Sequence, residues 1–252
     1  MKPRILVSND DGYQSEGIIA LVEAMADIGD VWVVAPEAEQ SAASHAISLH
    51  RPLRIREVKP RWWAVGGTPT DCSYLAIHHI MKDALPTLMV SGINHGANLA
   101  DDVTYSGTVA AAMEARLLDV SAIAFSLVAR PPFDFGPAAR FAAALVRAAF
   151  AQATGAPFLL NVNIPAGEPR GYAITKLGKH SYGAGVVDAK DPRGRTYFWI
   201  GGNEYEHQDI PGSDCNAIFD ERKVSVTPLQ LDLTDEDLLT PLRQWRLEGF
   251  SR

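Results

Sequence analysis

The sequence predicts an α/β fold built around a doubly wound, mostly parallel sheet, with a β-rich C-terminal arm. Strand-like apolar runs alternate with helical patterns over about the first 165 residues, which is typical of this fold class. The strand-like runs are continuously apolar, as in parallel strands that helices cover on both faces. After Pro165 the pattern changes to glycine-rich, short β-like pieces.

The first βαβ unit is the clearest in the chain. Residues 4–8 (RILVS) predict a buried strand, residues 16–28 a helix that stops at Gly29, and residues 31–36 (VWVVAP) a second buried strand. The helix places four apolar side chains on one face, at Ile18, Leu21, Met25 and Ile28. A strand, a helix and a strand within about 35 residues imply parallel strands.

The alternation then continues. Residues 41–58 are expected to form loop and edge structure. Further strands are expected at 62–67, 87–92, 121–127 and 158–165, and further helices at 68–81, 107–118 and 137–153. Thr70 or Asp71 is the expected N-cap of the helix at 68–81.

The C-terminal third has a different character. Residues 172–230 predict a β-rich excursion that returns to the main sheet or reaches toward a partner subunit. Residues 232–247 predict a final helix. We therefore expect residues 1–252 to form a single domain with an arm.

The charge and the cysteine content of the chain indicate which partners and which compartment to expect. The net charge is −7 and the pI is about 5.5, which argues against long nucleic acids but not against a small phosphate ligand. The two cysteines, Cys72 and Cys215, have no metal-type spacing and fit a reducing compartment. We see no signal peptide and no membrane-spanning run, so a cytoplasmic location without a membrane partner is expected.

Oxygen-bearing side chains follow three of the expected strands. Asp10 and Asp11 follow the first strand, Ser41 comes shortly after the second, and Asn94 follows the strand at 87–92. Adjacent carboxylates repel unless a cation lies beside them, and an oxygen-only ligand set suits Mg²⁺ or Mn²⁺. A strand-end turn with one capping aspartate explains the pair alone equally well. The shared location of the four residues favours a metal site.

A second pattern predicts an anion site. Ser106, Gly107 and Thr108 stand just before an alanine-rich helix, whose N-terminal N–H groups and dipole attract a phosphate. The alternative is an ordinary Ser/Thr N-cap. Such a cap requires neither the glycine nor the Asn-rich loop just upstream.

Other polar residues have simpler interpretations. Asp101 and Asp102 could orient metal-bound waters, although a charged pair in a loop is usually solvated. Lys179 and His180 could meet a substrate's charge, but a surface loop is the simpler expectation. Residues 66–71 could line a substrate or could only start a helix.

Taken together, these motifs resemble the SurE (survival protein E) family of metal-dependent nucleotidases. The motifs that carry the resemblance are ILVSNDDG, VVAP followed by Ser41, GTPTDC, VSGIN-G-N and YSGTVAAAMEA. They cover most of the chain and stand in the family's order. Ala42 and Ala100 occupy positions where the family usually has glycine, which puts substrate preference in question but removes no proposed ligand.

The resemblance implies a Rossmann-like fold, one divalent metal ion per subunit (Mg²⁺ or Mn²⁺), and a homodimer or homotetramer in which the arm exchanges contacts. It implies hydrolysis of nucleoside 5′- and 3′-monophosphates, and in some members of short polyphosphate. The implied metal ligands are Asp10, Asp11, Ser41 and Asn94, and the implied phosphate-binding residues are Asn98, Ser106, Gly107 and Thr108. Asp10 and Asp11 are the expected catalytic residues, and Asp10 is the better candidate to manage a proton.

Two other functions remain as alternatives. A receiver-like signalling module also carries an acidic pair that binds Mg²⁺, but it needs a phosphate-accepting aspartate at the end of a middle strand. Here the strand at 87–92 runs into Ser-Gly-Ile-Asn instead. A non-catalytic nucleotide-binding protein is the other alternative, although the G-x-G-x-x-G fingerprint is absent after the first strand.

Overall fold

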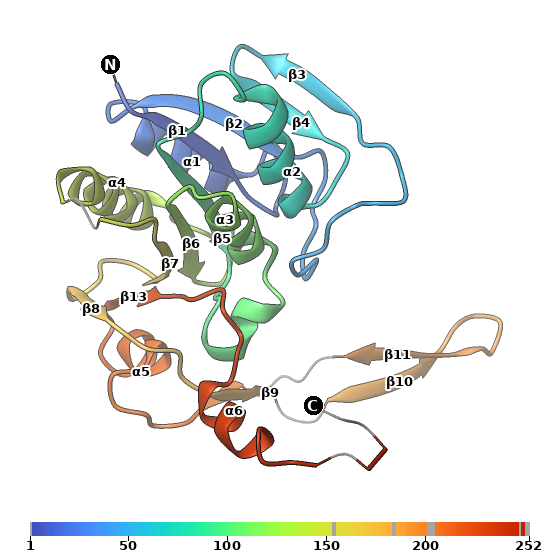
Figure 1. Ribbon diagram of the computed structural model, residues 1–252. Coiled ribbons are helices and arrows are strands. Elements are labelled where there is room, and N and C mark those ends of the chain that lie inside the picture. Colours follow the sequence, from blue (N-terminus) through green and yellow to red (C-terminus); the bar gives the residue numbers. More distant parts are fainter. Residues whose placement is uncertain (1, 153–154, 183–184, 201–204, 247, 250–252) are drawn as a thin grey trace.

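A nine-stranded sheet forms the centre of the protein (Figure 1). The structure is a computed structural model that describes residues 2–152, 155–182, 185–200, 205–246 and 248–249. The strand order is β3-β4-β2-β1-β5-β6-β7-β13-β8. The next strands along the chain lie on one side of β1, and the strands from β5 onward lie on its other side.

The middle of the sheet is parallel, and its strands are β1 (Arg4–Ser8), β2 (Asp30–Pro36), β5 (Leu88–His95), β6 (Ala122–Val128) and β7 (Leu159–Pro165). All are apolar runs buried on both faces along most of their length. At one edge lie β4 (Trp62–Val65) and the antiparallel β3 (Ile55–Lys59). The predicted α/β fold with a mostly parallel sheet is confirmed.

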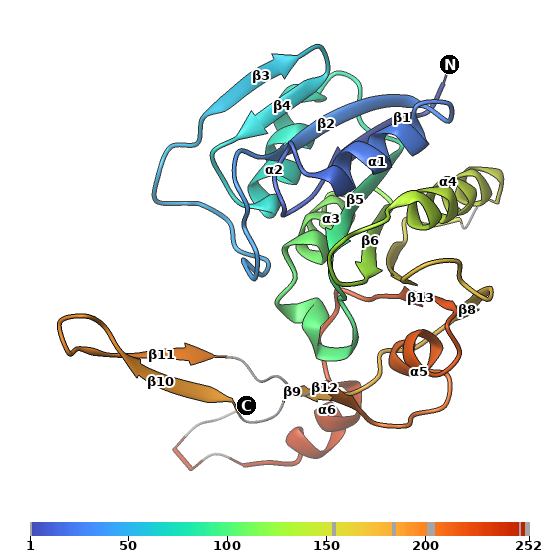
Figure 2. The same cartoon turned by 180° about the vertical axis from the view of Figure 1, so that it is seen from behind.

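Helices cover both faces of this sheet. Helices α1 (Glu16–Met25) and α4 (Gly136–Ala151) pack on one face, and α2 (Pro69–Leu75) and α3 (Gly107–Leu117) pack on the other. The view from behind shows α1 and α4 in front of the strands (Figure 2). Successive residues of β1 feed the two cores in turn, with Ile5 and Val7 in one and Leu6 in the other. This period of two fixes the register of the strand.

The C-terminal excursion leaves the sheet after β7 and returns to it. Strand β13 (Val224–Pro228) pairs antiparallel with β7, and β8 (Tyr172–Ile174) pairs parallel with β13. Between β8 and β13, β9 (His180–Tyr182) pairs with β12 (Tyr205–His207), and the hairpin β10 (Val186–Lys190) and β11 (Thr196–Ile200) extends away from the sheet (Figure 2).

Several predicted boundaries differ from the observed ones. The N-cap at Thr70 or Asp71 is wrong, because Thr68 caps α2 while Asp71 bonds back to the Thr68 backbone in a capping box. After α2, a single π-helical turn (Ala76–Ile80) completes the helical segment. The final helix is shorter than predicted, since α6 spans Glu236–Leu242.

Two further elements differ from prediction. Helix α5 (Asp214–Phe219), with Ser213 as its N-cap, lies within the excursion and was not predicted. Strand β5 runs past residue 92 to His95. The predicted helix ends at residues 153 and 247, and residues 183–184 and 201–204 of the predicted excursion, lie outside the described residues. Among the described helices, none combines the length and the apolar character that crossing a membrane requires.

Candidate active site

A cavity of about 280 Å³ opens where β1, β2 and β5 end, beside the N-terminus of α3. In an open α/β sheet, ligands bind beyond the carboxyl ends of the strands where the strand order reverses, and β1 is the strand at that reversal here. The cavity is lined by Asp10, Asp11, Glu39, Ser41, Ala42, Asn94, His95, Ala97, Asn98, Asp102, Tyr105 and Ser106. Residues from distant parts of the sequence therefore meet in one place.

The turn after β1 is held by a buried asparagine. The side-chain amide of Asn9 donates to Gly12 O at 3.0 Å and to Ser15 Oγ at 2.8 Å. Ser15 in turn caps α1. These bonds tie the turn to the start of α1 and fix where Asp10 and Asp11 lie at the cavity.

Asp10 packs directly against the first turn of α3. The Thr108 hydroxyl donates a hydrogen bond to Asp10 Oδ1. A Cβ atom built on Gly107 would lie 2.7 Å from Asp10 Cβ, so only glycine lets the helix approach this closely. Burial raises the pKa of Asp10 from its ordinary 3.8 to about 6, while the bonds from Thr108 lower it and Asp11 raises it further.

Asn94, near the end of β5, and Asp11, in the turn after the neighbouring strand β1, both line the cavity. A β-bulge shifts the β5–β6 register between Ser91 and Asn94, and such a bulge re-aims the side chains that follow it. The Asn94 amide nitrogen donates to Gly96 O at 3.0 Å, which leaves its oxygen for a cation. His95 Nδ1 lies 2.8 Å from Asp11 Oδ2, and Asp11 Oδ2 has no hydrogen-bond partner with good geometry.

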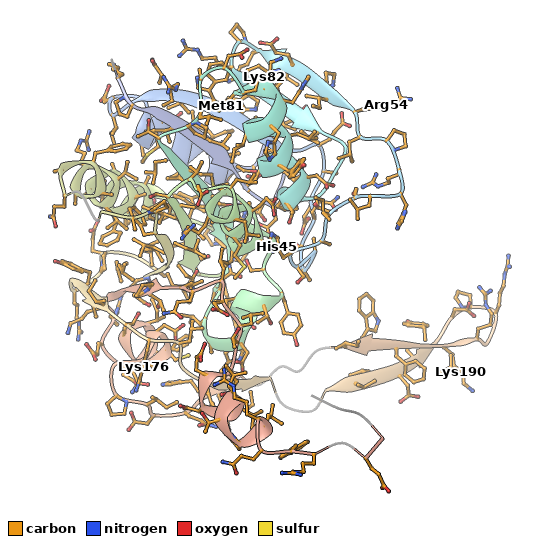
Figure 3. All side chains as sticks on the ribbon, viewed as in Figure 1. His45, Arg54, Met81, Lys82, Lys176 and Lys190 are labelled. Atoms are coloured by element: carbon orange, nitrogen blue, oxygen red, sulfur yellow. The ribbon has the colours of Figure 1, made fainter. Side chains whose placement is uncertain are left out.

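Ser41 reaches the cavity on a loop that rests against α3. Its hydroxyl donates to Glu39 Oε1 at 2.6 Å. Ser44 anchors the same loop through its backbone N–H to Tyr105 O at 3.0 Å. His45, labelled in Figure 3, follows on the same loop. Its Nε2 lies 2.8 Å from Glu114 Oε2 on α3. The wall that carries Ser41 is thus fixed to the same helix that packs on Asp10.

Ser106 and Asn98 line the cavity but also have structural partners. Ser106 Oγ accepts the Val109 N–H at 3.1 Å as the N-cap of α3, so the capping interpretation holds for it. Its O–H remains able to donate to a ligand. Asn98 is fixed by Asn163, which accepts its N–H at 2.8 Å, and by Ser126, which accepts its side-chain amide at 2.7 Å.

The residues present fit a hard dication. Asp10 and Asp11 both line the cavity, and Asp10 is buried with a raised pKa. A positive charge between or beside the two carboxylates offsets their repulsion and the cost of burying charge. Among the described residues, no group of three or more His, Cys, Asp or Glu side chains is arranged as a metal site. The fit therefore depends on oxygen atoms of Ser41 and Asn94 beside the aspartates, which suits Mg²⁺ or Mn²⁺ and not zinc.

Asp10→Asn is expected to stabilise the metal-free protein at neutral pH. Because the pKa of Asp10 is raised from 3.8 to about 6, ionising it costs the folded state on the order of 2–3 kcal/mol above pH 6, and nothing below its unfolded pKa. Asparagine keeps an acceptor for Thr108 and carries no charge. Thermal unfolding in EDTA should show a higher Tm for the variant near pH 7.5, by about 2–4 °C per kcal/mol. The difference should vanish near pH 4, and an equal difference at both pH values would contradict this account.

The cavity contains six of the eight residues that the sequence predicted, and the other two, Gly107 and Thr108, contact Asp10. Sequence reasoning missed Glu39 and gave His95 no role, although His95 contacts Asp11. Asn161 and Asn163 were also missed, and both donate to Asn98 O. Their spacing of two at the end of a strand places both side chains on one face, and this signal could have identified them.

The fold and the cavity define a doubly wound α/β protein with a carboxylate-lined crevice at its switch point. The family model "Survival protein SurE" matches residues 5–184. The chain is 66% identical over 250 residues to "5'-nucleotidase SurE" of Myxococcus xanthus (strain DK1622), covering 99% of this chain and 95% of that protein. It is 49% identical to the protein of that name in Geobacter sulfurreducens, covering 97% and 94% of the two chains.

A solved structure gives the same result. "Crystal Structure of Sure Protein from Aquifex aeolicus" superposes with a TM-score of 0.85 at 38% sequence identity, covering 96% of this chain and 98% of that one. The chain belongs to the SurE family, and the resemblance seen in its motifs is confirmed.

Proposed function

We propose that this chain is a metal-dependent 5′-nucleotidase that hydrolyses nucleoside 5′-monophosphates to a nucleoside and phosphate. One observation carries the proposal. Two adjacent carboxylates and the N-terminus of α3 share one cavity, in a chain 66% identical to a protein named 5'-nucleotidase SurE. A receiver-like module or a non-catalytic binder would not explain that identity.

Asp10, Asp11, Ser41 and Asn94 would hold one Mg²⁺ or Mn²⁺ ion. When bound, such an ion polarises a phosphoryl oxygen and lowers the pKa of a bound water. The metal contacts would replace the Ser41–Glu39 hydrogen bond and the close contact of His95 with Asp11.

The chain's own groups would bind and orient the phosphate. The Ser106 hydroxyl and the backbone N–H groups of Gly107 and Thr108 at the start of α3 lie beside Asp10, whose Oδ1 accepts the hydrogen of the Thr108 hydroxyl. They would balance the negative charge that builds on the phosphoryl oxygens. Asn98, on the loop that leads into α3, would add an amide donor. Asp10 would also manage a proton, since it contacts the Thr108 hydroxyl at the start of α3. Its pKa of about 6 is that of the metal-free protein, and a bound dication would lower it.

The decisive experiment is a substrate and metal panel. Phosphate release would be measured from 5′-AMP, 5′-GMP, 3′-AMP and tripolyphosphate, each with Mg²⁺, Mn²⁺ or EDTA. We expect metal-dependent release from the 5′-monophosphates and none in EDTA. Release from 3′-AMP or tripolyphosphate would extend the substrate range as the family resemblance implies. Stable phosphorylation of the protein without turnover would support the receiver alternative instead.

We further propose that the chain is a homodimer or homotetramer in the cytoplasm, joined through the β10–β11 hairpin. This hairpin exposes large apolar side chains, with Phe198 65%, Trp199 67% and Ile200 92% exposed. An exposed apolar patch of this kind marks an association surface.

Trp199→Lys is expected to lower the mass measured by light scattering toward that of a monomer. Thr196→Lys on the same strand is the control, and an unchanged mass in Trp199→Lys would contradict the role of the hairpin.

A further inference from the structure

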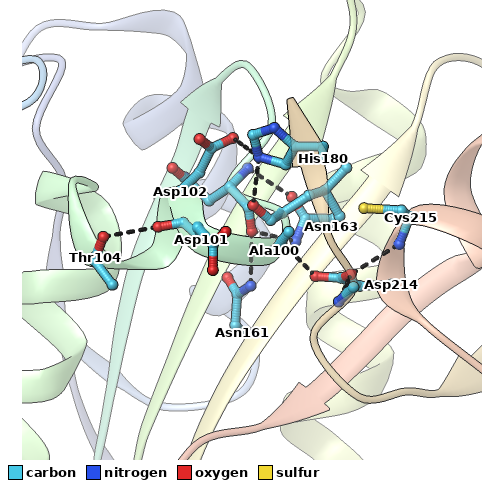
Figure 4. A network of polar contacts seen from close by, with 12 residues as sticks. Ala100, Asp101, Asp102, Thr104, Asn161, Asn163, His180, Asp214 and Cys215 are labelled. Atoms are coloured by element: carbon cyan, nitrogen blue, oxygen red, sulfur yellow. Dashed lines mark hydrogen bonds and ion pairs between the residues drawn. The ribbon is translucent and has the colours of Figure 1, made fainter. Parts of the chain in front are cut away.

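The loop that leads from β5 to α3, residues 96–106, carries the phosphate side of the cavity. Asn98, Asp102 and Ser106 lie on it and line the cavity. Two buried side chains from the C-terminal excursion, Asp214 and His180, reach across and hold this loop (Figure 4). The excursion thus contacts the active site from within one chain.

The side chain of Asp214 binds a backbone group of the loop. The carboxylate is fully buried, and its Oδ2 accepts the Ala100 N–H at 2.9 Å. Its Oδ1 accepts the N–H groups of Gly178 at 2.7 Å and Cys215 at 2.8 Å. Ala100 has a φ of 49°, a left-handed conformation that costs energy for a residue with a side chain. The charged acceptor stabilises that conformation and links it to the segment that leads into β9.

His180 contacts a side chain of the loop, that of Asp102. His180 Nε2 lies 3.1 Å from Asp102 Oδ2 and 3.2 Å from Leu99 O. The imidazole is 3% exposed and the Asp102 side chain 14% exposed, so the pair is screened from solvent. The prediction that His180 lies in a surface loop is therefore wrong, because the excursion folds this residue back onto the cavity.

The contact with Asp102 extends to the start of α3. Asp102 O accepts the N–H groups of Tyr105 at 2.9 Å and Ser106 at 3.0 Å. Ser106 is the N-cap whose following residues contact Asp10. Displacing Asp102 would therefore displace the amide end of α3 relative to Asp10. A shift of about 1 Å in such a site can cost as much as 10²-fold in rate.

We propose that His180 is a positioning residue that holds Asp102, and with it the phosphate-binding loop, in the geometry that binds the phosphoryl group. This inference rests on the proposed function and adds a residue to it. Asp214 supports the same loop from its other side. The residue acts through Asp102 and does not touch the substrate.

The test is His180→Ala, measured with 5′-AMP and Mn²⁺. We expect KM for 5′-AMP and Ki for inorganic phosphate to rise together by roughly tenfold, because one loop binds the phosphoryl group in both. The Kd for Mn²⁺, measured by calorimetry without nucleotide, should change by less than about twofold, since the aspartates lie on another loop. A merely structural role would lower the folded fraction and apparent kcat while leaving KM and Ki unchanged, and that result would overturn the proposal.

Two variants serve as controls. His207→Ala removes a histidine that faces His180 in the β9–β12 register and bonds Asp220 in a similar way, at 3.2 Å. It should leave KM and Ki unchanged. His180→Gln keeps an N–H donor and should recover much of the lost phosphate affinity. If Gln behaves like Ala, the donor is not what matters and the proposal fails.

A double-mutant cycle tests the route of the effect. If His180 acts through Asp102, then Asp102→Ala alone should raise KM and Ki, and adding His180→Ala should raise them little further. Additive effects would overturn the proposal, and Asp102→Ala still gives a result if His180→Ala does not fold. Failure of the proposed function is separate, because the wild-type chain would then release no phosphate from any nucleotide.

Discussion

Asp11→Asn is expected to lower kcat/KM for 5′-AMP by at least 10²–10³-fold, the order of loss seen when one charge-stabilising group is removed from an active site. Asp11 is one of only two carboxylates that we propose as ligands. Asparagine has the same shape, so the lost charge is the main change. The Kd for Mn²⁺ should rise in parallel, and calorimetry on the nucleotide-free protein measures it directly.

A matched control for this variant is Asp119→Asn. The Asp119 side chain is 91% exposed at the far end of α3, and its substitution should leave both activity and Mn²⁺ affinity unchanged. Near-normal activity of Asp11→Asn that persists in EDTA would rule out the proposed metal site.

Gly107→Ala is expected to lower kcat/KM by about 10²-fold, although it should favour the helix. In an exposed helix, alanine is about 1 kcal/mol more favourable than glycine. Here the new Cβ atom would lie 2.7 Å from Asp10 Cβ and 2.9 Å from Asp10 Oδ2. Either Asp10 or α3 must move, and a shift of this size at a reacting site costs up to 10²-fold. Steady-state kinetics and the Mn²⁺ Kd would show which of the two moves.

Gly66→Ala is the control for this steric argument. The nearest atom to its new Cβ would be Arg54 O at 3.8 Å, an ordinary contact, so activity should hardly change. Equal losses in the two variants would show that adding a methyl group, and not the contact with Asp10, causes the effect.

The parallel core was predictable because each strand is a continuous apolar run and α1 has a clear apolar face. The boundaries were less predictable. Strand β5 passes through a bulge at a glycine whose φ is 126°, and no local pattern marks where pairing resumes. Helix α5 has only six residues, too few for a periodicity to stand out.

The candidate site was predictable where chemistry and strand ends coincide, as at Asp10, Asp11 and Asn94. Residues that act through a partner were not predictable. His180 and Asp214 lie about 80 and 114 residues from the backbone groups that they bind, and a lone histidine or aspartate carries no signal of a distant partner. Such contacts arise from the way the excursion folds back, which only the three-dimensional structure reveals.

The pairing of β13 with β7 determines where the fold can accept insertions and deletions in the course of evolution. Asn163 and Ser225 are paired in the sheet. The segment between them is therefore an insertion whose two ends lie side by side. Lengthening such an insertion adds little to the entropic cost of folding, since the cost of closing a loop grows only with the logarithm of its length. The length of the outer hairpin can therefore change at little cost to folding, provided that His180 and Asp214 keep their contacts and that the apolar side chains proposed for association are retained.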